Sequence, residues 1–228
     1  MRYSTPLHLY ERAIKLHETK GWGSRKIEKE LGVGIVNRRT IDSWIHEGRK
    51  PVVIGVFDET YSPNLSYLLA ARYSDCTASK EVFKLEAMDK DFVEEFGRCL
   101  SNVMGRPYKI HNSGGIWGTE TAVRSIVNFM QKPLDAHKPI IDAYPKEFLR
   151  GFFDGEGHVG GHKREKYVYG YIGAKNTNFE VMEYVGRLLD RFSIHHKIYK
   201  VKERKRNCKP YLMLFINRER DVSAFASK

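Results

Sequence analysis

The chain has 228 residues, of which 41% are hydrophobic, enough for one large domain or two small domains with buried cores. Its 39 lysines and arginines exceed its 28 aspartates and glutamates, and the formal net charge of +11 favours a polyanionic partner, above all nucleic acid. Three cysteines without a Cys-x-x-Cys spacing, no visible signal peptide and no apolar run of bilayer length argue against a disulfide framework and a membrane protein, and predict an intracellular location in cytoplasm, nucleoid or organelle.

Residues 1–50 are predicted to form a small helical unit. Apolar side chains recur at helical spacing in residues 9–18, and a short helix over residues 24–31 has Ser24 as a good N-cap. Gly32 ends this helix, Val33 is placed to fill the turn, and Asn37 caps a third helix over residues 38–46. A helix, a glycine-containing turn and a second helix form the helix-turn-helix pattern.

This unit resembles the helix-turn-helix of recombinase-like and transposase-like DNA-binding domains, whose last helix enters the major groove. The resemblance implies that five residues of that helix face DNA: Arg38, Arg39, Thr40, Asp42 and Ser43. Nearby cations are candidates for phosphate contacts: Arg2, Arg25, Lys26, Arg49 and Lys50. A plain three-helix cap with solvated charges is the alternative.

Residues 51–63 read as a linker, either a flexible tether or a docked strap, and a duplicated unit over residues 64–228 follows. In its first copy, about residues 64–133, alternation predicts a strand over residues 81–87. Asp89 caps a helix over residues 90–104. A strand starts at Tyr108, Gly114 and Gly115 form a hairpin turn, and a helix covers residues 121–131.

The second copy spans about residues 144–228. Its first helix is expected at residues 146–155, followed by a polar stretch before a strand at residues 167–172. The remaining predicted elements are a helix over residues 177–192, strands over 196–201 and 210–216, and the start of a helix over 221–226. The repeat supports one α+β fold made of two αββαββα halves.

The stretch over residues 148–157 organises the chain. Leu149, Phe152 and Phe153 share one apolar helix face, while Gly151 and Gly155 lie one above the other on a second face. Two glycines on one helix face predict the close approach of another backbone, because glycine is otherwise unfavourable in a helix.

Residues 68–76 repeat this plan at a constant spacing. Ala70 matches Gly151, Ser74 matches Gly155, and Asp75 matches Glu156. If the two faces of small residues pack together, the two acids lie side by side at the end of the helix pair. Adjacent carboxylates repel each other unless a divalent cation lies between them.

Residues 148–159 closely resemble the second signature of the LAGLIDADG homing endonucleases, and residues 67–76 resemble a degenerate first signature that keeps only the acid of its final pair. The resemblance implies a monomer with internal pseudo-twofold symmetry, whose two sheets form a saddle on double-stranded DNA, and Mg²⁺- or Mn²⁺-dependent phosphodiester hydrolysis. Asp75 and Glu156 would hold metal, with Lys175 as a catalytic cation. The matching first-half positions, Ala87 and Met88, carry nothing polar.

Basic residues of the two predicted sheets are the candidates for DNA contact, and they are Lys80, Lys84, Lys109, Lys163, Arg164, Lys200, Lys202, Arg204, Lys205 and Arg206. A zinc site at His158 and His162 and base stacking by the alternating Tyr167, Tyr169 and Tyr171 are weaker interpretations, with core packing favoured for the tyrosines. Three functions remain open besides the endonuclease: a DNA-binding regulator on a retired nuclease fold, a nickase with one intact site, and an RNA-splicing maturase.

Overall fold

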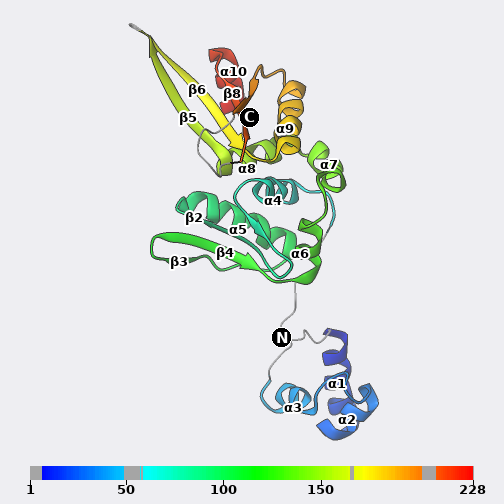
Figure 1. Ribbon diagram of the computed structural model, residues 1–228. Helices are drawn as coiled ribbons and strands as arrows, with labels where there is room; N and C mark the ends of the chain where they lie inside the picture. Colours follow the sequence, from blue (N-terminus) through cyan, green and yellow to red (C-terminus); the bar gives the residue numbers. More distant parts are fainter. Residues whose placement is uncertain (1–6, 49–56, 58, 165–166, 202–208, 228) are drawn as a thin grey trace. The chain divides into compact units, whose positions relative to one another are not determined.

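The computed structural model describes residues 7–48, 57, 59–164, 167–201 and 209–227 (Figure 1). Contacts divide the chain into two compact units, Met1–Gly55 and Val56–Lys228. Within the described ranges, none of the helices combines the length and apolar character needed to cross a membrane.

The first unit is a three-helix domain with helices α1 (Leu7–Lys20), α2 (Ser24–Leu31) and α3 (Arg38–His46). Its core contains Ala13, Ile27, Leu31, Val36, Ile41 and Trp44. The Asn37 side chain accepts a hydrogen bond from the Arg39 amide at 2.8 Å, which confirms the predicted cap.

Two details of this unit were predicted wrongly. Ser24 is the first residue of α2, and the N-cap is Gly23, which offers no side-chain hydrogen bond. Val33 does not fill the turn, since its side chain is 81% exposed, and Val36 is the turn residue that is buried. The turn holds Gly32 and Gly34 at positive φ, so the chain carries Val33 away from the core.

The second unit consists of two halves with the same element order. The first half contains α4 (Pro63–Tyr73), β1 (Thr77–Ala78), β2 (Phe83–Ala87), α5 (Lys90–Met104), β3 (His111–Ser113), β4 (Ile116–Thr121) and α6 (Arg124–Met130). The second half contains α8 (Pro145–Glu156), β5 (Gly157–Arg164), β6 (Tyr167–Asn176), α9 (Phe179–Arg191), β7 (Lys197–Val201), β8 (Tyr211–Ile216) and α10 (Glu219–Ala226). The helix α7 (Leu134–Ala143) lies between them in the sequence.

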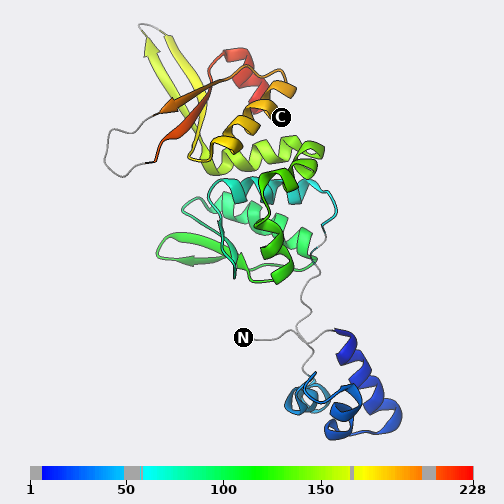
Figure 2. The same ribbon diagram turned by 45° about the vertical axis from the view of Figure 1, so that its right-hand side comes forward.

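Each half contains a four-stranded antiparallel sheet with the same topology. The strand orders are β1-β2-β4-β3 and β5-β6-β8-β7, so each half places its second and fourth strands in the centre. Strand alternation leaves one face of each sheet to the helices, as Leu212, Leu214 and Ile216 are buried while Tyr211, Met213 and Phe215 point the other way. Figure 2 shows α9 and α10 together on one side of the second sheet. The predicted α+β class and paired repeats are confirmed.

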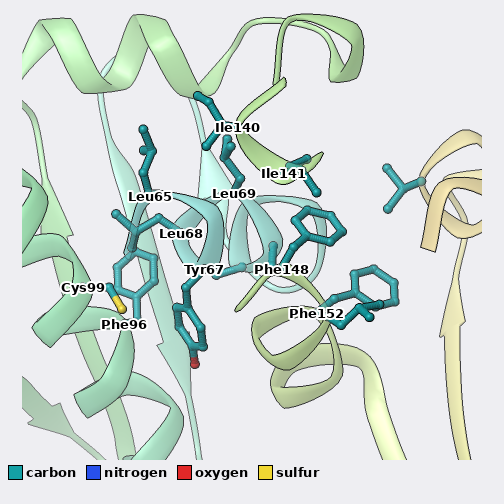
Figure 3. Packing of buried hydrophobic residues seen from close by; sticks show 14 of the residues in the cluster. Leu65, Tyr67, Leu68, Leu69, Phe96, Cys99, Ile140, Ile141, Phe148 and Phe152 are labelled. Atoms are coloured by element: carbon teal, nitrogen blue, oxygen red, sulfur yellow. The ribbon is translucent and has the colours of Figure 1, made fainter. Parts of the chain in front are cut away.

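The helices α4 and α8 join the two halves. Seven consecutive residues of α4, Leu65 to Ala71, are buried, so this helix is enclosed on all sides. Figure 3 shows Tyr67 of α4, and Phe148 and Phe152 of α8, among the buried side chains around these two helices. The Phe148 and Phe152 rings stack with their centroids 6.3 Å apart. The core is therefore continuous across the repeat boundary.

Several predicted boundaries need correction. The sequence pattern predicts no helix over residues 134–143, yet α7 covers them and includes Pro139. The stretch 160–166 was expected to be an irregular segment, but residues up to Arg164 belong to β5. Thr121 belongs to β4 and not to the helix predicted after it. In the linker, Phe57 is buried and its ring lies 5.0 Å from that of Phe129, so this residue is docked on the second unit.

Candidate functional site

The site lies where the ends of α4 and α8 meet. A Cβ at Gly151 would lie 2.9 Å from the Tyr67 carbonyl oxygen, and one at Gly155 would lie 2.4 Å from Ser74 Oγ. Both distances are shorter than real Cβ contacts, so the backbones approach closely only because these positions are glycine. The predicted packing of the two faces of small residues is confirmed, and it brings Asp75 next to Glu156.

The electrostatics of Glu156 show how close the two carboxylates are. Burial, and then the negative charge of Asp75, raise the pKa of Glu156 to about 7. Lys175 and a hydrogen bond from Asn176 act in the opposite direction and stabilise the carboxylate. Partial burial also raises the pKa of Asp75. The two carboxylates therefore repel each other unless positive charge is added between them.

Asn176, at the end of β6, fixes the position of Glu156. Its Nδ2 donates to Glu156 Oε1 at 2.8 Å and to the Tyr73 carbonyl oxygen at 2.9 Å. Its Oδ1 accepts from the amide of Asn178 at 2.7 Å, which sets the orientation of the amide. One side chain thus ties the last residue of α8 to the last residue of α4. Sequence reasoning missed it, although Asn176-Thr177-Asn178 before a helix was a visible signal.

A polar cleft of about 540 Å³ opens beside this carboxylate. Three cations line it, namely Arg72, Lys175 and Lys209, together with Glu156 and Asn176. Arg72 is held in place by its Nε, which donates to the Met130 carbonyl oxygen at 2.9 Å. A cleft with several cations beside an oxygen-rich site is suited to an anionic ligand such as phosphate.

The first half lacks the equivalents of Lys175 and Asn176. Asn178 caps α9 by accepting from the Val181 amide, and Asp89 caps α5 by accepting from the Phe92 amide, so the two caps occupy the same place in each half. Counted back from these caps, Glu86 and Ala87 take the positions of Lys175 and Asn176, so the match to Ala87 and Met88 made from the sequence was one residue too far along the chain. Glu86 accepts a hydrogen bond from Lys84 Nζ at 2.6 Å on the sheet surface. The two halves of the site are therefore chemically unequal.

Asp154 takes part in a hydrogen-bonded network that links the two halves. Tyr67 Oη donates to Asp154 Oδ2 at 2.7 Å. Arg150 stacks over the Tyr67 ring with 4.6 Å to its centroid, and its Nη2 donates to Glu95 Oε1 at 2.6 Å. Arg98 and Arg150 together hold the pKa of Glu95 down to about 2. This network crosses the interface between the halves.

The structure places the predicted DNA-contact residues of the second unit in several settings. Lys80 and Lys109 are exposed, and Lys84 lies on the outer face of its sheet in the pair with Glu86. Lys200 lies on the helix-covered side, with Nζ 5.0 Å from the centre of the Phe179 ring. The side chains of Lys163 and Arg164, and residues Lys202, Arg204, Lys205 and Arg206, lie outside the described part of the chain.

In the first unit, α3 lines a shallow concave surface of about 480 Å³ with Asn37, Arg39, Thr40, Ser43 and Glu47. Three of the five α3 residues predicted to face DNA, Arg39, Thr40 and Ser43, therefore share one surface. Arg38 is not among the residues that line it, and its Nε lies 3.9 Å from Asp42 Oδ2.

The oxygen donors at Asp75 and Glu156 suit a hard divalent cation. Among the described residues, no three His, Cys, Asp or Glu side chains form a cluster able to hold a metal. The zinc interpretation also needs His162, whose side chain lies outside the described part of the chain. Mg²⁺ is commonly held by one or two carboxylates, with water and substrate phosphates completing its coordination. Two carboxylates that repel each other beside a cationic cleft fit that pattern.

Comparisons with known proteins agree with this geometry. The LAGLIDADG-like domain family matches residues 143–228. Among solved structures, variants of the homing endonuclease I-DmoI superpose with a TM-score of 0.55 at 15% identity, covering 74% of this chain and 96% of theirs. The complex of I-DmoI with DNA and Mn gives the same TM-score, at 14% identity. Full-length DUF199/WhiA from Thermatoga maritima gives 0.53 at 18% identity, covering 75% of this chain and 56% of that one.

Two curated relatives come from Methanocaldococcus jannaschii. The uncharacterized protein MJ0398 is 27% identical over 192 residues, which cover 79% of this chain and 68% of that protein. The uncharacterized protein MJ0314 is 28% identical over 152 residues, which cover 60% of this chain and 57% of that protein.

Paired signature helices between two sheets of identical topology define the second unit as a two-repeat LAGLIDADG fold. The resemblance seen in the sequence is thereby confirmed. The arrangement of two repeats in one chain is the fold seen in the solved structures of I-DmoI.

Proposed function

We propose that this protein is a site-specific, metal-dependent double-strand DNA endonuclease of the LAGLIDADG homing type. The observation that carries the proposal is the pair of carboxylates at the end of the α4–α8 contact, where burial and Asp75 raise the pKa of Glu156 to about 7. Two carboxylates that repel each other in this way are strongly stabilised when a cation binds between them. The I-DmoI complexes with DNA and Mn and with DNA and Ca support the same assignment.

In the proposed reaction, Asp75 and Glu156 would hold Mg²⁺ or Mn²⁺. The cation would stabilise the charge that develops on the phosphate and on the leaving oxygen. Asn176 keeps Glu156 in place through its hydrogen bond, and Lys175, on the same cleft, neutralises phosphate charge. The exposed basic residues of the sheets would contact the DNA backbone, and the α3 surface of the first unit would add a second DNA contact.

The experiment is cleavage of a randomised duplex DNA library with Mg²⁺ or Mn²⁺ by wild type and by the variants Glu156→Gln and Asp75→Asn. Double-strand breaks at one enriched sequence, lost in both variants, are expected. Glu183→Gln is the matched control, because Glu183 is an exposed acid on α9 away from the cleft. A wild type that cuts no sequence with either metal would refute the proposal.

A second candidate is a nickase or a non-cleaving DNA-binding protein. The observation that favours it is Glu86 and Ala87 at the positions of Lys175 and Asn176. The first half therefore lacks the lysine beside the carboxylate and the asparagine that hydrogen-bonds to it. Breaks confined to one strand would identify the nickase. Sequence-specific binding that is unchanged by EDTA and produces no breaks would identify the binding protein.

The internal duplication supports a monomer as the active form, because one chain already holds both halves of the site. Light scattering on the free protein and on its DNA complex tests this. A dimer in both states would contradict the monomer.

A further inference from the structure

The outer face of the second sheet, the one away from α9 and α10, carries a row of aromatic rings. The His158 and Tyr171 ring centroids are 5.9 Å apart, those of Tyr171 and Phe215 are 5.4 Å apart, and those of Phe215 and Tyr199 are 6.1 Å apart. These four residues lie on β5, β6, β8 and β7, which is the order of the strands in the sheet. The rings therefore form one continuous row across all four strands.

Two glycines of the sheet make room for this row. Gly160 pairs with Tyr171 across β5 and β6, and a Cβ there would lie 2.3 Å from the Tyr171 ring. Gly173 pairs with His158, and a Cβ there would lie 2.7 Å from the His158 ring. Any side chain at either position would displace a ring, so the row depends on these glycines.

The described charged residues around the row are basic. Lys175 pairs with Met213 in the ladder and Lys197 pairs with Phe215, so both lysines project on the same face as the rings. None of the described residues of β5, β6, β7 and β8 is acidic. A surface of rings flanked by lysines matches a ligand that combines flat apolar groups with negative charge.

The first sheet has a different outer face. Its central strands present Lys84, Glu86 and Glu120, and His111 lies beside them on β3. Carboxylates of this kind accept hydrogen bonds from base edges but repel phosphate. The aromatic row is therefore a property of the second half alone and is not required by the shared fold.

We propose that this aromatic row, defined by His158, Tyr171, Phe215 and Tyr199, binds single-stranded nucleic acid by stacking unpaired bases on its rings. In a duplex the base faces are stacked on one another and only their edges are accessible, so rings have no face to contact. In a single strand each base has a free face, and Lys175 and Lys197 are placed to meet the adjacent phosphates. This binding requires no phosphodiester hydrolysis, although it shares Lys175 with the proposed cleavage site.

Equilibrium binding to short labelled oligonucleotides, measured by fluorescence anisotropy in EDTA, tests the proposal. The ligands are oligothymidylate, an abasic strand of equal length and charge, a duplex of the same length, and oligouridylate. Oligothymidylate or oligouridylate is expected to bind well above the abasic strand. Equal binding of the abasic strand would overturn the proposal, since charge alone would then explain the affinity.

Substitutions at Tyr199 localise the contact, because this side chain is 49% exposed and its loss leaves the core intact. Tyr199→Leu keeps apolar area but removes the ring, and is expected to weaken single-strand binding by at least about fivefold while leaving abasic-strand binding unchanged. Tyr199→Trp is expected to retain binding. Ile116→Ala is the matched control, because Ile116 is equally exposed on β4 of the first sheet.

Unchanged affinity in Tyr199→Leu would refute the assignment to this face, and so would an equal loss of duplex binding in that variant. Because no cleavage is scored and metal is chelated, the result is separate from that of the endonuclease experiment. A chain that fails to cut DNA can still bind single strands here, and one that cuts DNA can still fail this test.

Discussion

The raised pKa of Glu156 predicts that the metal-free protein is destabilised by its own active-site charge. The pKa is 4.5 in the unfolded reference and about 7 in the folded state. The folded state therefore binds more protons than the unfolded state between these values, and the free energy of unfolding falls as pH rises through this window. Above pH 7 the full penalty is present, and below pH 4.5 it is lost.

The magnitude follows from the shift. One pKa unit is worth about 1.4 kcal/mol, so the shift converts to about 3 kcal/mol, or about 2 kcal/mol after allowance for the solvent-accessible part of the carboxylate. Glu156→Gln removes the charge and keeps an oxygen that accepts from Asn176. At pH 8 in EDTA this variant should be more stable than wild type by about 2 kcal/mol, a rise of about 4–8 °C in Tm for a unit of this size.

Calorimetry of the full chain at pH 5 and pH 8 measures this, with Glu183→Gln as the control for removal of an exposed charge. The gain in Glu156→Gln should shrink strongly at pH 5. Asp75→Asn should give a similar gain at pH 8, and the double variant should gain less than the sum, because the two charges act on each other. Equal gains at both pH values would refute the account of the carboxylate pair.

The remaining predictions concern metal and the interface between the halves. In calorimetry at pH 8, Mg²⁺ or Mn²⁺ at one hundred times its Kd should stabilise wild type by about 2.7 kcal/mol and should leave the stability of Glu156→Gln unchanged. A metal-induced shift of equal size in that variant would exclude the Glu156 carboxylate as a ligand. Gly155→Ala should lower the free energy of unfolding by about 1–3 kcal/mol in urea titration, because the new Cβ would lie 2.4 Å from Ser74 Oγ. An unchanged midpoint would contradict the prediction, since it would mean that α4 and α8 can move apart without loss of stability. Tyr67→Phe should cost about 1 kcal/mol at neutral pH through the lost hydrogen bond to Asp154, and full stability in this variant would assign the interface to apolar packing alone.

The sequence was sufficient to predict the paired repeats and the helix contact, because glycine in a helix has few purposes other than close packing. It also placed the acids Asp75 and Glu156 together. It did not predict α7, which contains Pro139, because proline normally interrupts a helix. Here the burial of Ile140 and Ile141 stabilises the helix despite the proline.

The strand β5 was missed for a related reason. Glycine and charged residues have low strand propensity, and the pairing with β6 is a tertiary effect that no local pattern records. The aromatic row could not be predicted for the same reason, since it depends on strand pairing. Alternation showed that Tyr171 shares a face with other tyrosines, but only the sheet order shows that its neighbours are His158 and Phe215.

The candidate site is a property of the contact between the repeats and belongs to neither repeat alone. The pKa of Glu156, from the second repeat, depends on the charge of Asp75 from the first. Asn176, from the second repeat, bonds to Glu156 and to the backbone of Tyr73 in the first. Because one side chain spans both helix ends, a change in helix spacing alters the position and the charge of Glu156 together. The coupling does not make the two halves equal: Lys175 and Asn176 stabilise the Glu156 carboxylate, while Glu86 and Ala87 take the equivalent positions in the first half, which supplies Asp75.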